Sequence, residues 1–391
     1  MFSKRTDWKL TPNRFTEVQR QLHAASREVL DLTVSNPTRA GLRYDAEAIL
    51  NSLSNREAMD YDPQPKGLAS AREAVAAYYR EEHCEVEIDP EAFILTTSTS
   101  EGYSYVFRLL CNPNDELLVP KPSYPLFEFL ADLQDVIRTP YPLLYDHGWQ
   151  IDFPSLSRAV NSRTRAVVLV HPNNPTGSYA RTDERTQLNS FCREHGLALI
   201  VDEVFLDYPH DGARRPSFVR NPDVLTFTLS GVSKISGLPQ MKLAWVAVSG
   251  PAEDVTAAMD RMEMIADTYL SMNAPIQLAA ATLLGQRKNI QPSILDRVRM
   301  NLAELDRQLA LQKASQRLQV EGGWYAVLRV PVTRSDEDLA IDLLRRASVL
   351  VHPGHFYDFP NDGYLILSLL TPPAEFCEGT RRIFELLNNA G

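Results

Sequence analysis

Two almost purely aliphatic runs, at residues 166–170 and 197–201, constrain the fold of this chain more than any other feature. Apolar residues that are continuous rather than alternating indicate strands buried on both faces. The segment between them, 182–195, has helical periodicity, and Thr182 can serve as its N-cap. Doubly buried strands that alternate with helices predict an α/β fold, in which helices wrap a mainly parallel sheet.

The same alternation extends over the middle of the chain and then stops. Further strands are expected at 93–97, 116–119, 224–229 and 243–248, and helices at 101–110 and 125–133. After residue 251 we expect two long helical stretches, 252–286 and 292–314, and then a smaller mixed unit with strands at 324–330 and 364–369 and helices at 336–347 and 373–388. We therefore predict a large domain at 46–290 and a smaller α+β unit at 291–391, on which the N-terminal arm 1–45 is expected to pack.

The net charge of the chain limits the kinds of partner that we expect it to bind. The chain has 40 Lys and Arg against 50 Asp and Glu, a net charge of −10, which argues against a nucleic-acid partner and against docking on an anionic membrane. No apolar run approaches the ~20 residues of a membrane helix, and residues 1–10 lack the apolar core of a signal peptide. Cys84, Cys111, Cys192 and Cys377 are far apart, so we expect no metal site and no disulfide framework. Free thiols are typical of a cytoplasmic protein.

Polar residues follow three of the predicted strands at the point where each strand ends. The run 166–170 leads into the segment 171–177, which reads His-Pro-Asn-Asn-Pro-Thr-Gly; 197–201 leads into Asp202-Glu203, and 224–229 leads into 230–234, which ends in Lys234. Ligands of parallel sheets bind beyond the carboxyl ends of the strands. An amide, a carboxylate and an amine are therefore expected at one rim, where a lysine that loses its charge by burial becomes a nucleophile for carbonyl groups.

The chain has no GxGxxG, Walker, HExxH or GxSxG motif, so nicotinamide, nucleotide, zinc-protease and α/β-hydrolase chemistry is not predicted. Asn-Pro-Thr-Gly after one strand, Asp-Glu after the next and Ser-Lys about thirty residues later resemble the class I/II pyridoxal 5'-phosphate (PLP) aminotransferases of fold type I. The resemblance runs from about Asp31 to Leu387. Its other matching segments are Asn36-Pro37-Thr38, Tyr61 with Gly67, Pro122-Ser123-Tyr124, Gly322-Gly323 and Pro353-Gly354.

The resemblance implies a role for each matching residue around the cofactor ring. Lys234 would form the internal aldimine with PLP and then carry the proton between cofactor and substrate. Asp202 would keep the pyridine nitrogen protonated, which makes the ring a stronger electron sink. Tyr124 would stack on the ring, and Asn174 would donate to the ring oxygen. A core aromatic residue and a turn asparagine are the plainer interpretations of the last two.

Other matching positions are expected around the cofactor phosphate. Ser98, Thr99 and Ser100 precede the helix 101–110, where hydroxyls and free N–H groups form an anion site, although they also suit an ordinary N-cap. Tyr61 resembles the tyrosine that reaches across a homodimer interface to the partner's phosphate.

Four positions depart from the family pattern. Lys242 stands where an arginine usually grips the phosphate, so the charge is kept but the bidentate fork is lost. Phe205 stands where a tyrosine usually donates to the ring oxygen. Gly231 replaces a usual serine, for which Ser230 or Ser233 could substitute.

The fourth departure concerns the substrate. An arginine usually binds the substrate carboxylate from a strand near the C-terminus, and Ile366 occupies that position. Either another arginine binds the carboxylate, with Arg39, Arg43 and Arg329 as candidates, or the substrate has no carboxylate there. His355 could also face the substrate. A solvated surface role is the plainer interpretation of all four.

We predict a homodimeric PLP-dependent aminotransferase that moves an amino group from an amino acid or amine to a keto acceptor, both small molecules. Another PLP reaction (β-elimination, decarboxylation or racemisation) and a PLP-binding protein without turnover are the alternatives, because all of these begin at the same cofactor site.

Overall fold

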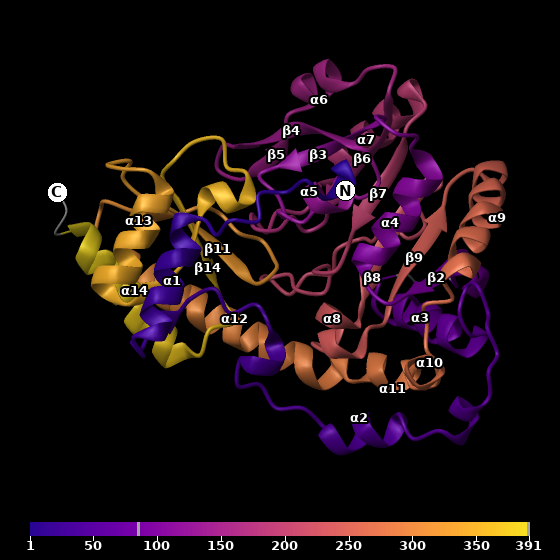
Figure 1. The fold of residues 1–391 in the computed structure, drawn as a ribbon, viewed down its shortest axis with the longest axis horizontal. Helices are drawn as coiled ribbons and strands as arrows, with labels where there is room; N and C mark the ends of the chain where they lie inside the picture. The colour runs from indigo at the N-terminus through magenta and orange to yellow at the C-terminus, as the bar shows by residue number, and fades with distance from the viewer. Residues whose placement is uncertain (84–86, 389–391) are drawn as a thin grey trace.

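An eight-stranded sheet forms the centre of the larger lobe in the computed structural model, which describes residues 1–83 and 87–388 (Figure 1). Cys84 lies outside the described residues. The strands lie in the order β2 (Phe93–Thr96), β9 (Ala244–Ser249), β8 (Thr226–Gly231), β7 (Ala198–Asp202), β6 (Thr164–Val170), β3 (Glu116–Lys121), β4 (Ile137–Tyr145) and β5 (Trp149–Ile151). The five strands from β8 to β4 are parallel, which confirms the predicted α/β class.

Strand β9 is antiparallel to both of its neighbours, and β5 is antiparallel to β4. The reason for the reversal at β9 lies in its connection. A parallel crossover usually contains a full helix, whereas the helix between β8 and β9 is only the four-residue α8 (Val232–Ile235).

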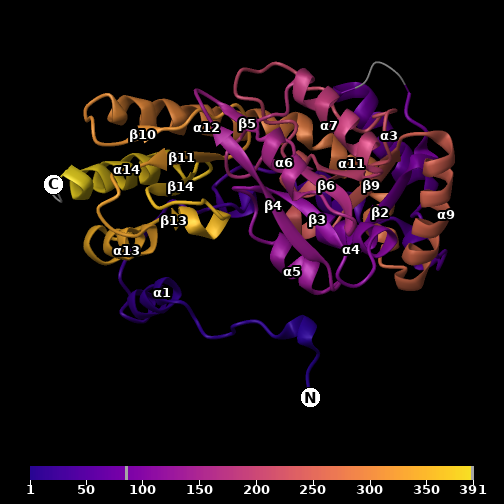
Figure 2. The ribbon, with the colours of Figure 1, turned by 90° about the horizontal axis from the view of Figure 1, so that it is seen from above.

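Helices cover both faces of this sheet (Figure 2). One face carries α4 (Thr99–Leu110), α5 (Phe127–Asp132) and α9 (Ala252–Tyr269), and the other carries α3 (Ala69–Glu82), α6 (Phe153–Ala159), α7 (Thr182–His195) and α11 (Ala280–Gly285). Along β6, Val168 and Val170 pack with the first set, and Val167 and Leu169 with the second. Both faces of the strand are thus buried, which explains its continuous apolar run.

Two local expectations are wrong. The N-cap of α7 is Arg181 rather than Thr182, because the Glu184 carboxylate reaches back to accept from the Arg181 backbone N–H at 2.9 Å. The stretch 252–286 is three helices rather than one. Helix α9 ends where Leu270 adopts a φ of 44°, and Asn273 then caps α10 (Ala274–Leu278).

Helix α12 (Arg287–Leu309) leads from the large lobe into a smaller one, at the left of Figure 1. There a four-stranded antiparallel sheet has the order β10 (Gln316–Arg317), β11 (Tyr325–Arg329), β14 (Tyr364–Ser368) and β13 (His352–Pro353). Helices α13 (Asp336–Asp342) and α14 (Pro373–Asn388) pack beside it, and a π-helical turn, Leu343–Ala347, continues α13. Leu284 packs with the large sheet, whereas Ile290 packs with the small one.

The N-terminal segment lies mainly on the small lobe. Helix α1 (Arg14–Ala24) contacts α13, and β1 (Leu30–Asp31) pairs in parallel with β12 (Val349–Leu350). Before α1 the chain reaches back to the large lobe, where Trp8 Nε1 donates to Asp132 Oδ2 at 2.9 Å. The remaining elements are α2 (Ala46–Ser52) and 3-10 turns at Lys4–Thr6, Pro37–Arg39, Arg56–Met59, Pro90–Ala92, Pro239–Met241 and Gly354–Tyr357.

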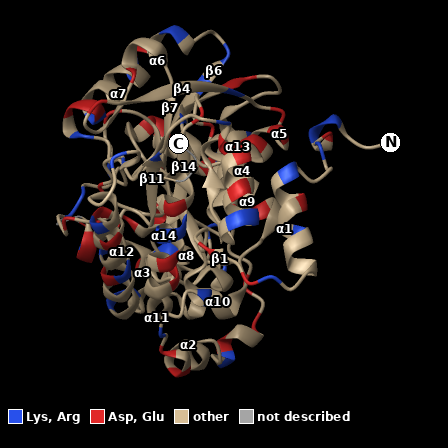
Figure 3. Cartoon of the chain, turned by 90° about the vertical axis from the view of Figure 1, so that its left-hand side faces the viewer, with Lys and Arg blue, Asp and Glu red and all other residues tan. Residues whose placement is uncertain are grey.

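Acidic and basic residues are interspersed over the helices of the small-lobe end (Figure 3), as in the ion pairs that Arg381 and Arg382 form with Glu378. Cys111, Cys192 and Cys377 are free thiols. Among the described residues, no helix has the length and apolar character needed to cross a membrane.

Candidate active site

The predicted functional groups meet where β6, β7 and β8 end. Val170 pairs with Asp202, and Asp202 pairs with Leu229, so β6 and β7 end level with one another and β8 continues beyond them to Gly231. Asp202 is the last residue of β7, and Lys234 lies in α8 directly after β8. They share a cavity of about 220 Å³ lined by Ser35, Thr99, Ser100, Tyr124, Val170, Asn174, Asp202, Val204, Phe205, Ser233, Lys234 and Tyr325.

Lys234 stands in an environment that disfavours its charge. Burial lowers the pKa of its amine to about 8, and the negative charge of Asp202 opposes part of that effect. Its Nζ lies 5.2 Å from the centroid of the Trp324 ring and 5.6 Å from that of Phe205. A substantial fraction of the amine is therefore neutral near pH 8, as a nucleophile for carbonyl carbon requires.

Asp202 is only 8% exposed and is held by two hydrogen bonds. The Val204 backbone N–H donates to Oδ1 at 3.1 Å, and the Tyr103 hydroxyl donates to Oδ2 at 3.0 Å. Burial raises the pKa of Asp202, whereas both donors and the Lys234 charge lower it. A protonated ring nitrogen would supply the further cationic donor that such a buried carboxylate lacks. Sequence reasoning missed Tyr103, although it lies one helical turn after Thr99.

Asn174 follows β6 in a loop that docks on the small lobe. Its Oδ1 is buried without a hydrogen-bond partner. In the same loop Gly177 has a φ of 69°, and its carbonyl accepts from the Gly322 N–H at 3.0 Å. A Cβ on Gly177 would lie 2.4 Å from the Gly322 carbonyl oxygen, so only glycine permits this approach. The contact anchors the start of β11 and thereby places Tyr325 in the cavity wall.

The N-terminus of α4 supplies an anion site. Thr99 and Ser100 line the cavity from its first turn, while Ser98 caps the helix by accepting from the Glu101 N–H at 3.2 Å. Gly102 lets this turn rest on β9, because a Cβ there would lie 2.9 Å from Val246 Cγ2. Backbone N–H groups and hydroxyls at a helix start suit a phosphate group.

Three predicted residues stand apart from this cavity in the protomer. Tyr61 is 83% exposed, and Lys242 is exposed with a φ of 54°. Ser230 is buried with its Oγ 3.5 Å from the Glu203 carbonyl oxygen. Their roles at the cofactor, like that of Ser98, stay predictions.

None of the arginines proposed for the substrate lines the cavity. Arg39 and Arg43 are exposed on the N-terminal segment, and Arg329 is exposed four residues beyond Tyr325, about 13 Å along the strand. His355 is also exposed and outside the lining. The cavity instead contains Ser35 and Tyr325, which sequence reasoning did not select. Both stand beside motifs that it did notice, namely Asn36-Pro37-Thr38 and Gly322-Gly323.

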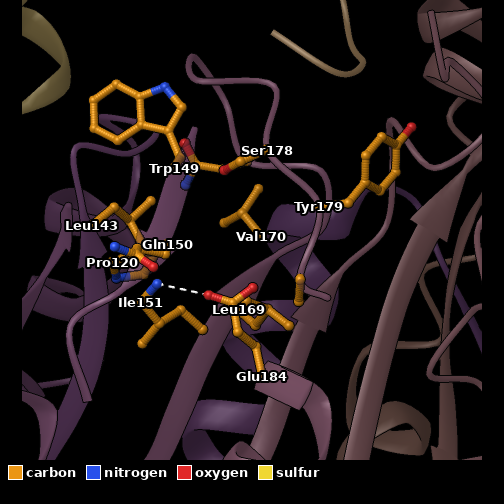
Figure 4. A pocket seen from close by; sticks show the side chains of 12 residues that line it. Pro120, Leu143, Trp149, Gln150, Ile151, Leu169, Val170, Ser178, Tyr179 and Glu184 are labelled. Atoms are coloured by element: carbon orange, nitrogen blue, oxygen red, sulfur yellow. Dashed lines mark hydrogen bonds between the residues drawn. The ribbon is translucent and has the colours of Figure 1, made fainter. Parts of the chain in front are cut away.

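A second cavity lies between β5 and the loop after β6 (Figure 4). Its volume is about 20 Å³, room for about one water molecule. The Glu184 carboxylate on its wall is already bonded to the Ile151 N–H at 2.8 Å. This cavity is therefore too small for a substrate.

The larger cavity fits PLP. It offers an amine of lowered pKa for the aldehyde, a buried carboxylate for the ring nitrogen and, on its wall, the Asn174 side chain, whose Nδ2 group can donate to the ring oxygen. The α4 N-terminus offers an anion site for the phosphate.

Comparisons with known proteins give the same picture. A sequence model described as aminotransferase class I and II matches residues 27–372. The chain is 27% identical over 358 residues to glutamate-pyruvate aminotransferase AlaA of Haemophilus influenzae, covering 89% of this chain and 88% of that protein. It is 28% identical over 382 residues to an alanine aminotransferase of Mycobacterium bovis, covering 94% and 87%. Among solved structures, an alanine aminotransferase from Pyrococcus furiosus superposes with a TM-score of 0.90 at 21% identity, covering all of both chains, which shows the shared fold.

Proposed function

Because the chain belongs to the class I and II aminotransferase family, we propose that Lys234 is the amine that binds the cofactor aldehyde and carries the reacting proton. The protein is a PLP-dependent aminotransferase with small-molecule substrates. When bound, PLP supplies an aldehyde carbon that takes up the amino group and an electron-poor ring that accepts electrons from the substrate carbon.

The other cavity residues would hold the cofactor and orient its ring. Asp202 would keep a proton on the ring nitrogen, and the Tyr103 hydroxyl fixes the carboxylate in place. Tyr124 would hold the ring, and Thr99 and Ser100, which line the cavity, would bind the phosphate with the N–H groups of α4. The lowered pKa of Lys234 lets its amine accept a proton from the substrate carbon and return it near neutral pH.

The observation that carries this assignment is the presence of Lys234 and Asp202 in one cavity. Borohydride reduction of the PLP-loaded enzyme, followed by peptide mapping, should place the added cofactor mass on the peptide that contains Lys234. Lys234→Ala should remove that mass and the reducible visible absorption, while Lys313→Ala, at an exposed lysine, should leave both unchanged. Cofactor mass retained by Lys234→Ala would overturn the assignment.

We also propose that the enzyme works as a homodimer in the cytoplasm, where its free thiols would stay reduced. Tyr61 and Leu270 are exposed and line one surface cavity between the segment around residue 60 and the end of α9, and three further large apolar side chains on these two segments are also exposed: Met59, Met264 and Tyr269. This patch adjoins the start of α4, because Ser271 donates to the Glu101 carboxylate at 2.9 Å.

A dimer through the patch would bring Tyr61 toward the partner's phosphate site, as the family pattern predicts. Sedimentation equilibrium should give twice the chain mass of 44.1 kDa. Tyr61→Glu should shift the protein toward the monomer and weaken PLP binding, because a buried charge is costly at an apolar interface. A wild-type monomer at micromolar concentration would contradict this part of the proposal.

A further inference from the structure

The small lobe closes one side of the cavity with hydroxyl groups. Tyr325 of β11 lines the cavity, and Ser35, at the exposed mouth, hydrogen-bonds to its hydroxyl. Burial raises the pKa of Tyr325 well above its ordinary value. The hydroxyl therefore stays protonated at neutral pH and can both donate and accept a hydrogen bond.

Strand register shows what stands beside Tyr325 on the same face of the small sheet. Val327, two residues further along β11, shares the face of Tyr325 and pairs with Ile366, which in turn pairs with His352. Val327 and Ile366 are aliphatic and buried. Burial lowers the pKa of His352, so this imidazole is neutral at neutral pH. The face that would have to bind a carboxylate thus presents hydroxyl, aliphatic and neutral imidazole groups.

Among the described residues, Lys234 is the only cationic side chain in the cavity lining of the protomer, and the proposed function assigns it to the cofactor aldehyde. Arg297 is not part of this lining and donates its Nη1 to the carbonyl oxygens of Ala40 and Leu370. Asp202 adds a negative charge. A carboxylate in this cavity would lose hydration without gaining an opposite charge, which is unfavourable, whereas a neutral hydroxyl finds both a donor and an acceptor.

We propose that the amino donor carries an uncharged hydrogen-bonding group, such as hydroxymethyl, beside its reacting carbon in place of a carboxylate. This inference rests on the proposed function, because it concerns the same cavity. The donor carbon would give its hydrogen to Lys234 as a proton, and Lys234 would return that proton to the former aldehyde carbon. The same cofactor carbon would take the donor's nitrogen and the electron pair and become an aminomethyl group. The aldehyde oxygen would leave as water, and a water molecule would supply the carbonyl oxygen of the oxidised donor, so no other oxidant is needed.

Three donors that differ in one substituent test the proposal. Alanine, alaninol and isopropylamine carry a carboxylate, a hydroxymethyl and a methyl group on an otherwise identical amine, and the first two are used as racemates. Each is mixed with PLP-loaded enzyme without an acceptor, and the pyridoxamine 5'-phosphate formed is quantified by chromatography after denaturation. Alaninol should react at least about tenfold faster than alanine at equal concentration, a difference of ~1.4 kcal/mol.

Two variants test whether Tyr325 and Ile366 cause the expected preference for alaninol over alanine. Tyr325→Phe should slow alaninol about fivefold, as expected for one lost hydrogen bond, and change isopropylamine less than about twofold. Ile366→Arg should raise the rate with alanine. If that buried substitution prevents folding, Tyr325→Phe still tests the proposal.

The outcomes separate the two levels of inference. No pyridoxamine 5'-phosphate from any of a broad set of amines would count against the proposed function. Its formation from alanine at a rate equal to or above that from alaninol would overturn the inference about the donor and leave the function intact. Equal slowing of alaninol and isopropylamine by Tyr325→Phe would also overturn the inference, because it would mean that Tyr325 does not hydrogen-bond to the hydroxyl group of alaninol.

Discussion

The electrostatics of the cavity predict that the Lys234 amine of the cofactor-free enzyme titrates at a lower pH than an ordinary lysine. An amine with a pKa of about 8 is about 24% neutral at pH 7.5, whereas one with the ordinary 10.5 is about 0.1% neutral. Burial therefore raises the reactive fraction about 240-fold at that pH. Asp202→Asn removes the one charge that raises the pKa of this amine, so the variant's midpoint should fall below that of the wild type.

Reductive methylation with formaldehyde, whose small size suits a buried amine, measures this midpoint. Brief labelling of cofactor-free enzyme between pH 6 and 10.5, followed by peptide mass spectrometry, gives the rate at Lys234, and the exposed Lys313 serves as reference in the same digest. We expect a midpoint near pH 8 in the wild type. A midpoint near 10.5, or a higher midpoint in Asp202→Asn, would refute the reasoning.

Three further substitutions test other parts of the structure. Tyr103→Phe removes a buried hydrogen bond to a carboxylate, worth about 1.5–3 kcal/mol, so the pKa of Asp202 should rise and the titration midpoint of the Lys234 amine should fall, by less than in the Asp202→Asn variant. Gly177→Ala should lower the free energy of unfolding by at least about 1 kcal/mol more than Gly41→Ala, because both have φ near 70° but only the first meets a neighbouring atom; equal losses would exclude the clash. Burial raises the pKa of Glu203 to about 7, so the folded state binds more protons than the unfolded chain between pH 4.5 and 7 and loses stability as pH rises through that range, by up to about 3 kcal/mol. Glu203→Gln should flatten this dependence in thermal melts, and an unchanged slope would contradict the assignment.

The central sheet and the rim of the site could be predicted from sequence because the geometry of parallel strands is nearly deterministic. A continuous run such as 166–170 requires cover on both faces, and the carboxyl ends of neighbouring parallel strands meet at one edge. Once the runs before Asn174, Asp202 and Lys234 were recognised as strands, their convergence followed. Where the predicted elements were wrong, local capping residues had overridden the apolar periodicity. Asn273 and Pro275 begin a new helix inside a stretch whose apolar periodicity favours a single one.

Tyr103 could not be found this way, because its role depends on how α4 packs rather than on a strand end. It lies on α4, which approaches the sheet closely only because Gly102 has no side chain to keep it from β9. The periodicity of 101–110 predicts a helix but not the depth at which that helix rests. A tyrosine one turn from a helix start is otherwise an ordinary core residue.

Tyr325 reaches the site through a contact between segments about 145 residues apart. The carbonyl of Gly177 binds the backbone of Gly322, and that bond sets where β11 enters the cavity wall. Motif spacing marks both glycines but does not show that they touch. The wall that we propose to select the donor is therefore built by docking of the two lobes. Lys234 and Asp202 are instead placed by the ends of β8 and β7, with Tyr103 of α4 and Trp324 of the small lobe packed against them. Substitutions along β11 and β14 should accordingly change which amine reacts, with little effect on the titration of Lys234.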